Sequence, residues 1–277
     1  MVFCRGGSSA CFPGGECDEA RGNSVTAPKR GWLQSGWAHT LVLVVALLAL
    51  WQALYWWAGD VALAPPLATF AYTAKLFTTE SFDAHVIDTL RAFAIAYALS
   101  VVIGLVVGFW LGFDRLSGDV LEPMIVSLYA VPKLTLYPIL LLAFGLGLSA
   151  KVAFGVIHGV IPIILFTLSA VQNTKPILVK TGRVLNLSRS QMVRWILFPA
   201  AIPEIFTGLR VGFALTLIGS LLAEMFASQR GLGYLLMNGI GLHNVELIMS
   251  VTLIIVVFAF AVSSFLLYVD KRLHRRV

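Results

Sequence analysis

The sequence predicts an all-α polytopic membrane protein with six transmembrane helices. Of its 277 residues, 58% are hydrophobic and only 12% are charged, about half the charged fraction of an average soluble domain. Runs of about 20 apolar residues recur along the chain, and each is long enough to cross a hydrocarbon core of about 30 Å as a helix. The lysines and arginines gather in alternate connecting segments, which is the pattern that membrane topology imposes.

The first segment, residues 1–31, is rich in Gly and Ser and contains all three cysteines, Cys4, Cys11 and Cys17. The cysteine spacing fits no zinc-binding pattern, and the segment has no apolar stretch of the kind that a secretory signal needs. We expect a disordered cytoplasmic tail without a metal site, followed by a transmembrane domain over residues 32–277.

The six predicted spans then follow in order. Three tryptophans and a tyrosine close the first span, as expected at a membrane–water interface, and the Pro65-Pro66 pair precedes a short helix over 67–77. Pro123 stands near the start of the third span, where its missing N–H costs least. The predicted spans cover residues 40–57, 87–113, 121–144, 152–171, 203–226 and 247–269.

The basic residues orient these spans. With the N-terminus inside, fourteen of the twenty lysines and arginines fall in cytoplasmic segments, so we expect both termini in the cytoplasm. Membrane orientation thereby accounts for the net charge of +6, and nucleic-acid binding is excluded. The fourteen residues are Arg5, Arg21, Lys29, Arg30, Arg115, Lys175, Lys180, Arg183, Arg189, Arg194, Lys271, Arg272, Arg275 and Arg276.

The second span carries small residues at every fourth position. Such a ridge lets another helix approach closely, because van der Waals contact between backbones replaces the hydrophobic drive that is absent in lipid. The partner helix could belong to a second copy of the chain or to the same subunit, and packing within one subunit is the favoured alternative. The ridge consists of Ala92, Ala96, Ser100, Gly104, Gly108 and Gly112.

The segment over residues 175–200 is polar and basic between two apolar spans. Pro176 suits the first turn of a helix, and Asn186 suits the left-handed residue that closes one. Ser188 and Gln191 read as a capping box that starts a second short helix, which Pro199 is expected to end. The apolar residues Met192, Val193, Ile196 and Leu197 gather on one side of that helix, and Arg194 points elsewhere.

Such a helix–turn–helix could lie on lipid headgroups or fit a groove of a partner protein. The continuation "ILFPAAIPEIFTGLR" (196–210) favours the partner, because it resembles the stretch that follows the EAA loop of bacterial ABC importer permeases. Lys180, Thr181 and Gly182 stand where that family has Glu-Ala-Ala, and Asn186 stands for its Gly. Phe198-Pro199 replaces its Leu-Pro.

Three further stretches extend the resemblance over roughly residues 63–268. They are "HVIDTLRAFAIAYALSVVIGLVVGFWLG" (85–112), "VPKLTLYPILLLAFGLGLSAK" (131–151) and "LLAEMFASQRGLGYLL" (221–236). Together they are similar to the nitrate/sulfonate/taurine branch of type I importer permeases. The resemblance implies the type I importer permease fold, with its core over 85–269, in a bacterial inner membrane.

The resemblance also implies partners and a division of labour. We expect a second permease copy in a homodimer, a cytoplasmic ABC ATPase dimer, an external solute-binding protein and surrounding lipid. No phosphate-binding loop occurs in the sequence, since "GLGLSAK" (145–151) lacks the required spacing. We therefore expect a non-catalytic chain without a cofactor, with ATP and Mg²⁺ bound by the ATPase. The residues expected to couple to that ATPase are Arg183, Leu185, Asn186, Ser188, Arg189, Gln191, Met192, Val193, Arg194, Ile196, Leu197 and Pro199.

The candidate solute path centres on Lys133, which is predicted about 18 Å inside the third span. A charge at that depth indicates function, and it would attract a small anionic solute of the nitrate, sulfonate or taurine kind. Tyr129 and Glu224 are the other candidate residues of the path. The alternative is a structural ion pair, for instance between Lys133 and Glu224. His158 is interpreted as a packing residue, and Arg210 is expected to extend its head group toward the interface.

Two other function classes compete with the importer permease. An ion-coupled secondary transporter should show paired inverted repeats with broken helices, and the sequence has no such internal symmetry. An integral membrane enzyme should show a catalytic cluster, and neither a metal-binding histidine motif nor a Ser/His/acid grouping stands out.

Overall fold

The computed structural model describes residues 36–274, apart from the side chains at positions 36–38, 80, 189, 227, 273 and 274. The predicted tail over 1–31 and its cysteines lie outside the described residues. The chain divides between Leu47 and Leu48 into two units, a boundary that falls inside the first helix, α1 (Gly36–Ala58). In the first unit, the described side chains of α1 are all exposed and mostly apolar, which suits a helix surrounded by lipid.

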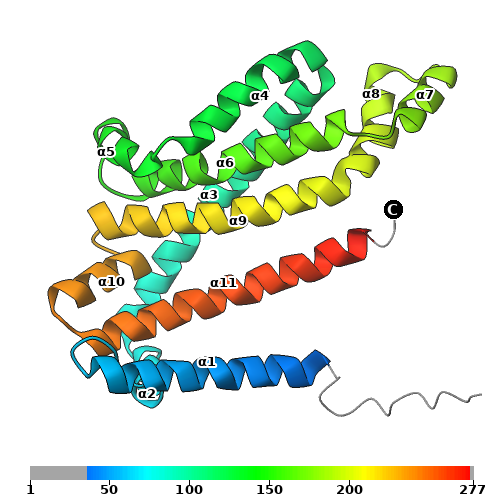
Figure 1. The fold of residues 1–277 in the computed structure, drawn as a ribbon. Helices are drawn as coiled ribbons and strands as arrows, with labels where there is room; N and C mark the ends of the chain where they lie inside the picture. The colour runs from blue at the N-terminus through cyan, green and yellow to red at the C-terminus, as the bar shows by residue number, and fades with distance from the viewer. Residues whose placement is uncertain (1–35, 275–277) are drawn as a thin grey trace, which may run out of the picture. The chain divides into compact units, whose positions relative to one another are not determined.

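The second unit is a bundle of long helices, shown in Figure 1. After α2 (Pro66–Leu76), the chain forms α3 (Glu80–Phe113) and later α6 (Leu148–Gln172) and α9 (Phe198–Ala227). These three pack against one another and form the centre of the unit. The C-terminal helices are α10 (Leu232–Gly241), which the sequence analysis missed, and α11 (Val245–His274).

The small-residue ridge of α3 packs against α6 of the same subunit, as the favoured alternative predicted. A Cβ added at Gly104 would overlap Ile163, and one added at Gly108 would overlap Thr167. The contact repeats at Gly112 with Val171. Each successive glycine therefore meets a β-branched side chain of α6 that lies one turn further along. At these three positions the two backbones approach too closely to admit a side chain on α3.

The predicted third span is broken, and its prediction as one continuous helix was wrong. It consists of α4 (Arg115–Ala130), a 3₁₀ turn over Lys133–Leu136 and α5 (Tyr137–Phe144), and the two halves are bent by 84°. The cause is Pro132, which holds the preceding Val131 in an extended conformation (φ −62°, ψ 133°) and removes a backbone donor.

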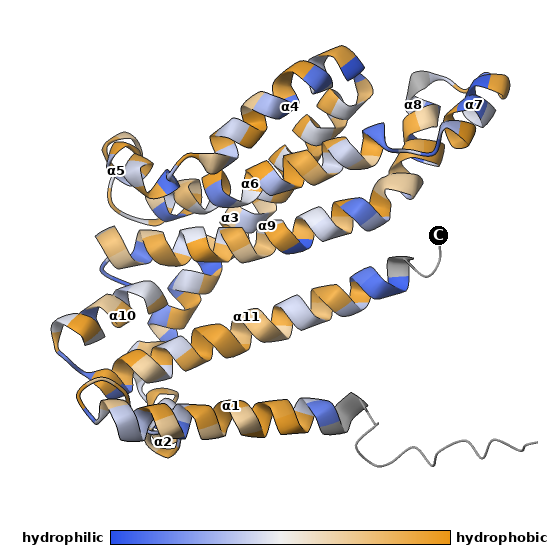
Figure 2. Cartoon of the chain, viewed as in Figure 1, coloured by the Kyte–Doolittle hydropathy of each residue, from blue (hydrophilic) through white to orange (hydrophobic). Residues whose placement is uncertain are grey.

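Five described helices are long and apolar enough to cross a membrane, and the bent α4–α5 pair makes six if it counts as one span. Figure 2 shows apolar residues around most of the circumference of α1, α9 and α11, while polar residues concentrate near α7 and α8 and at the end of α11. The six-helix membrane class that the sequence predicts is therefore confirmed, with the third span bent.

Candidate functional site

The polar segment between α6 and α9 begins with α7 (Pro176–Val184). Asn186 follows it with φ 50°, one of the two described non-glycine residues with positive φ. Its N–H donates to the carbonyl of Arg183 at 3.0 Å, and the N–H of Leu187 donates to the carbonyl of Gly182 at 3.1 Å. This pair of bonds is a Schellman motif, so the left-handed role predicted for Asn186 is confirmed.

The predicted capping box is also confirmed. The N–H of Ser188 donates to Gln191 Oε1 at 2.9 Å, and the N–H of Gln191 donates to Ser188 Oγ at 3.4 Å. These reciprocal bonds satisfy donors at the start of α8 (Arg189–Met192). Arg189 begins that helix, and its side chain lies outside the described part of the chain.

Pro199 does not end the second helix, contrary to the prediction. A π-helix over Val193–Leu197 continues directly from α8 into α9, and Pro199 occupies the first turn of α9. The N–H of Phe198 donates to the carbonyl of Val193, five residues back. The wider π turn lets the helix continue without the hydrogen bond that Pro199 cannot donate.

The apolar side predicted to face a partner packs largely inside the segment. Met192 and Ile196 lie against Gly182 of α7, where an added Cβ would meet both side chains at 2.6 Å. Leu197 is buried, and Val193 is half-buried. Met192 and Ile196 thus hold this part of the segment against α7, so part of the predicted face is occupied inside the segment.

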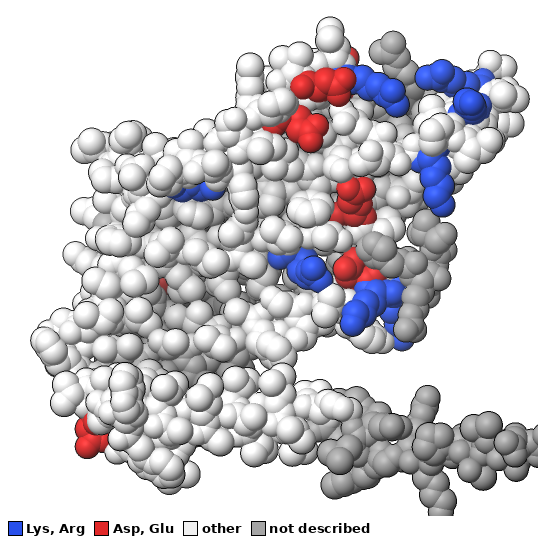
Figure 3. All heavy atoms as spheres, in the orientation of Figure 1, with Lys and Arg blue, Asp and Glu red and all other residues white. Residues whose placement is uncertain are grey.

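Other apolar residues form the exposed surface of the segment. Val184, Leu185 and Trp195 are 80%, 64% and 68% exposed. The guanidinium of Arg194 lies 5.8 Å from the centre of the Trp195 ring, and Arg183 is also exposed. In Figure 3, basic side chains lie at this end of the second unit, over α7 and at the end of α11. The exposed residues of this segment therefore include Arg183, Val184, Leu185, Arg194 and Trp195.

Lys133 lies at the break between α4 and α5 and not inside the continuous helix that the sequence predicted. Its depth in the membrane stays a prediction. Its Nζ donates to the carbonyl of Tyr129 at 2.9 Å and lies 4.6 Å from the centre of the Tyr129 ring. The ammonium thus satisfies a carbonyl near the end of α4. Lys133 forms no ion pair with Glu224, which is held by other partners.

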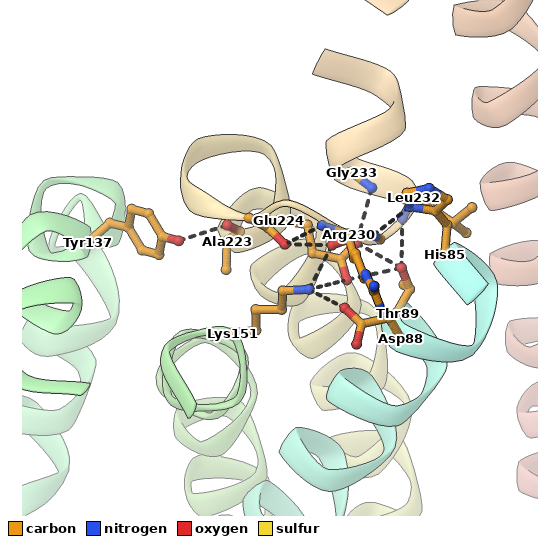
Figure 4. A network of polar contacts seen from close by, with 12 residues as sticks. His85, Asp88, Thr89, Tyr137, Lys151, Ala223, Glu224, Arg230, Leu232 and Gly233 are labelled. Atoms are coloured by element: carbon orange, nitrogen blue, oxygen red, sulfur yellow. Dashed lines mark hydrogen bonds and ion pairs between the residues drawn. The ribbon is translucent and has the colours of Figure 1, made fainter. Parts of the chain in front are cut away.

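Glu224 is fully buried near the end of α9, as Figure 4 shows. Its carboxylate accepts hydrogen bonds from Thr89 Oγ1 at 2.8 and 3.0 Å and from the N–H of Gly233 at 3.0 Å. Lys151 Nζ lies 3.5 Å from the same carboxylate and 2.5 Å from that of Asp88. Glu224 therefore exposes no surface to a solute in this conformation.

The same network fixes the loop that precedes α10. Lys151 donates to the carbonyl of Arg230 at 2.8 Å, and the N–H of Gly231 donates to His85 Nδ1 at 3.1 Å. Gly231 has φ 122°, and a Cβ there would overlap the Glu224 carboxylate. The loop therefore needs glycine at this position. We call Asp88, Thr89, Lys151, Glu224 and Gly231 the α10 clasp.

Lys151 was predicted to lie in a connecting segment, so the clasp was not predicted. A signal was present, because α3 and α6 are predicted to begin on the same side of the membrane. Asp88 and Lys151 stand near those two beginnings with opposite charges. His158 was interpreted correctly, since it packs between Phe154 and Gly219 and its Nδ1 lies 2.9 Å from the carbonyl of Phe154.

Arg210 lies fourteen residues before Glu224 on α9, about 21 Å along the helix, and it lines a cavity of about 460 Å³. Its Nη1 lies 3.8 Å from Oδ2 of Asp270 on α11. Tyr129 of α4 also lines the cavity, whereas Lys133 and Glu224 do not. Of the three residues predicted for the solute path, Tyr129 is therefore the one that lines this cavity.

Residues 100–277 match the family model described as "Binding-protein-dependent transport system inner membrane component". The match covers more than half of the chain, including the segment at α7–α8 and the helices that line the cavity, and it leaves out Asp88 and Thr89 of the clasp. The chain belongs to this family. As a permease of this family it has the type I ABC importer permease fold and is a multi-pass component of the inner membrane.

Similar permeases are known from several bacteria. SsuC of Bacillus subtilis, assigned to aliphatic sulfonate transport, is 25% identical over 88% of this chain and 90% of its own length. The nitrate import permease NrtB of Synechocystis is 28% identical over 78% and 80%. TauC of Escherichia coli, from a taurine transport system, is 25% identical over 68% and 69%. These relatives are transport permeases, and this permease likewise belongs to an ABC importer.

Proposed function

We propose that this permease forms the solute pathway of an ATP-driven importer for a small anion and couples to a cytoplasmic ATPase through residues 175–200. ATP and Mg²⁺ bind to the ATPase, a second copy of the permease completes the pathway, and an external binding protein delivers the solute. Both termini lie in the cytoplasm. The relatives named for sulfonates, nitrate and taurine support an anionic solute.

We infer the coupling role from the contacts that make the segment over 175–200 rigid. Its turn is fixed by the Schellman motif at Asn186 and the capping box at Ser188, and its end continues into α9 through the π-helix. A second tie lies at its base, where Ser169 Oγ of α6 donates to Glu204 of α9 at 2.8 Å. A rigid element of this kind can transmit displacement between a partner and a transmembrane helix.

The contact with the ATPase is supplied by Arg183, Val184, Leu185, Arg194 and Trp195, which we call the coupling surface. Trp195 is the kind of large aromatic side chain that dominates protein interfaces, and truncation of such a residue commonly costs about 2 kcal/mol or more. Arg183 and Arg194 are positioned to pair with acidic groups of the partner. Met192 supports this surface from inside, through its contact with Gly182.

The test is co-purification of the permease with its ATPase. We expect Trp195→Ala to weaken the complex at least tenfold and to reduce solute-stimulated ATP hydrolysis in proteoliposomes. Trp57→Ala is the matched control. Trp57 is also strongly exposed, at 87%, but it lies at the external end of the first predicted span. If Trp195→Ala retains full binding and stimulation, the segment lies on lipid headgroups and the coupling proposal is wrong.

A further inference from the structure

We propose that the cavity bordered by α4, α9 and α11 binds a small organic anion with an apolar body, and that Arg210 recognises its charged group. The inference rests on the proposed function, because it places a stage of the solute pathway at this cavity. It also assigns the recognition to residues outside the predicted set of Lys133, Tyr129 and Glu224, of which only Tyr129 takes part.

The size and walls of the cavity determine the class of ligand. A volume of about 460 Å³ lies in the range of small-molecule sites, about 300–1,000 Å³. A single water molecule occupies about 30 Å³ in the liquid, so a small inorganic anion would leave most of the space empty. Leu215, Phe260 and Leu267 provide apolar walls that favour a hydrocarbon body.

Arg210 provides the charge at one side of this apolar space. It lies on α9 seven residues after Pro203, where the fifth predicted span begins, and its head group lies near Asp270 of α11. Its distance of 3.8 Å from Asp270 is too long for a direct hydrogen bond. The planar guanidinium can therefore offer a bidentate pair of donors to a carboxylate or sulfonate.

Neutral donors stand around the same space. The hydroxyls of Ser263 and Ser264 on α11 line the cavity, and Tyr129 lines it from α4. Asp270 does not line the cavity, so it can orient Arg210 without presenting its carboxylate to the ligand. On the α4 side, the ammonium of Lys133 lies over the Tyr129 ring and adds positive potential near the cavity.

The test measures binding of three probes to the permease–ATPase complex in phosphatidylcholine nanodiscs by calorimetry. Benzenesulfonate carries both the charge and the apolar body, benzenesulfonamide carries only the body, and sulfate carries only the charge. We expect benzenesulfonate to bind at least tenfold more tightly than either control, which corresponds to about 1.4 kcal/mol.

Two variants test the site independently. Arg210→Gln should weaken benzenesulfonate binding at least tenfold, while Arg210→Lys retains part of it. Ala214→Phe fills the cavity from an exposed lining position and should abolish binding without altering any charge. The latter variant keeps the test valid if Arg210→Gln fails to fold. Arg115→Gln, which removes an exposed cation at the start of α4, is the control and should bind as the unmodified chain does.

Three results would overturn the inference. They are the absence of benzenesulfonate binding to the intact complex, full binding by Ala214→Phe, and displacement of the probe by phosphatidylglycerol in the nanodiscs, which would make the cavity a lipid site. In each case co-purification of the ATPase would still support the proposed function. Loss of the ATPase from the unmodified permease would instead contradict that function.

Discussion

Glu224 is a fully buried acid in a membrane helix, and its neighbours determine whether the fold tolerates it. Lys151, only 3% exposed, stands between the carboxylates of Glu224 and Asp88, and Thr89 and the Gly233 N–H complete the hydrogen bonds of Glu224. A buried ion pair of this kind adds little net stability when it is complete. Removing one partner, however, leaves an uncompensated charge and costs about 3–5 kcal/mol.

We therefore predict that Lys151→Met destabilises the purified permease by about 3–5 kcal/mol, measured by chemical unfolding in detergent. Lys75→Met, at an exposed position, is the matched control and should have little effect. The double variant Lys151→Met/Glu224→Gln should recover part of the loss, since a glutamine oxygen can still accept from Thr89 and Gly233. Equal stability of Lys151→Met and Lys75→Met would show that the clasp does not hold this end of the bundle.

Single residues also show what sequence reasoning can predict about the site. Asn186, Ser188 and Gln191 were predicted correctly because their bonds are local, within five residues along the chain. The ion pair between Lys133 and Glu224, which was given as the alternative to a role in the solute path, does not form, because the partners of both residues depend on which helices touch. The partner of Glu224, Lys151, is 73 residues away, and no local pattern connects the two positions.

At the level of helices, the contact between α3 and α6 is the best test of the packing. Gly108 lies in the middle of this contact, and an added Cβ would lie 2.5 Å from Cβ of Thr167 and 3.0 Å from the carbonyl oxygen of Ile164. Neither atom can move without shifting the backbone of α6. The close contact between α3 and α6 therefore depends on the absence of a side chain at this position of α3.

We predict that Gly108→Ala lowers the free energy of unfolding by about 1–3 kcal/mol, the usual cost of overpacking. Gly241→Ala in α10 is the matched control, because nothing lies within 4 Å of the added Cβ there, and it should be neutral or slightly stabilising. The same unfolding assay compares the two variants. A Gly108→Ala protein as stable as the control would contradict the close contact.

The positions of the membrane helices could be predicted from apolar runs, but whether a helix is continuous or broken at a proline could not. The spans over α3, α6, α9 and α11 were predicted because an apolar run of about 20 residues has few alternatives in a membrane. Two prolines were then misread. Pro132 breaks a span predicted to be continuous, and Pro199 is accommodated where a break was expected. The difference lies in whether the preceding turn can widen, and that depends on tertiary packing.

For the whole molecule, the basic residues at the α7–α8 end predict the orientation in the membrane. We expect a reporter fused after Val277 to be cytoplasmic and one inserted at residues 242–244, between α10 and α11, to be external. Alkaline phosphatase and green fluorescent protein report the two sides in complementary ways. Opposite activities at either position would reject the six-span orientation and place the coupling surface outside the cell.

The continuity of α9 with the segment before it has a mechanical consequence. With 30 residues, α9 is about 45 Å long and acts as a lever whose one end is the coupling segment and whose other end carries Glu224. A tilt of about 5° about the first end would displace the second by about 4 Å, more than the length of a hydrogen bond. The clasp cannot stretch that far. Such a tilt must therefore either carry α3 and α6 along as one body or release the loop before α10.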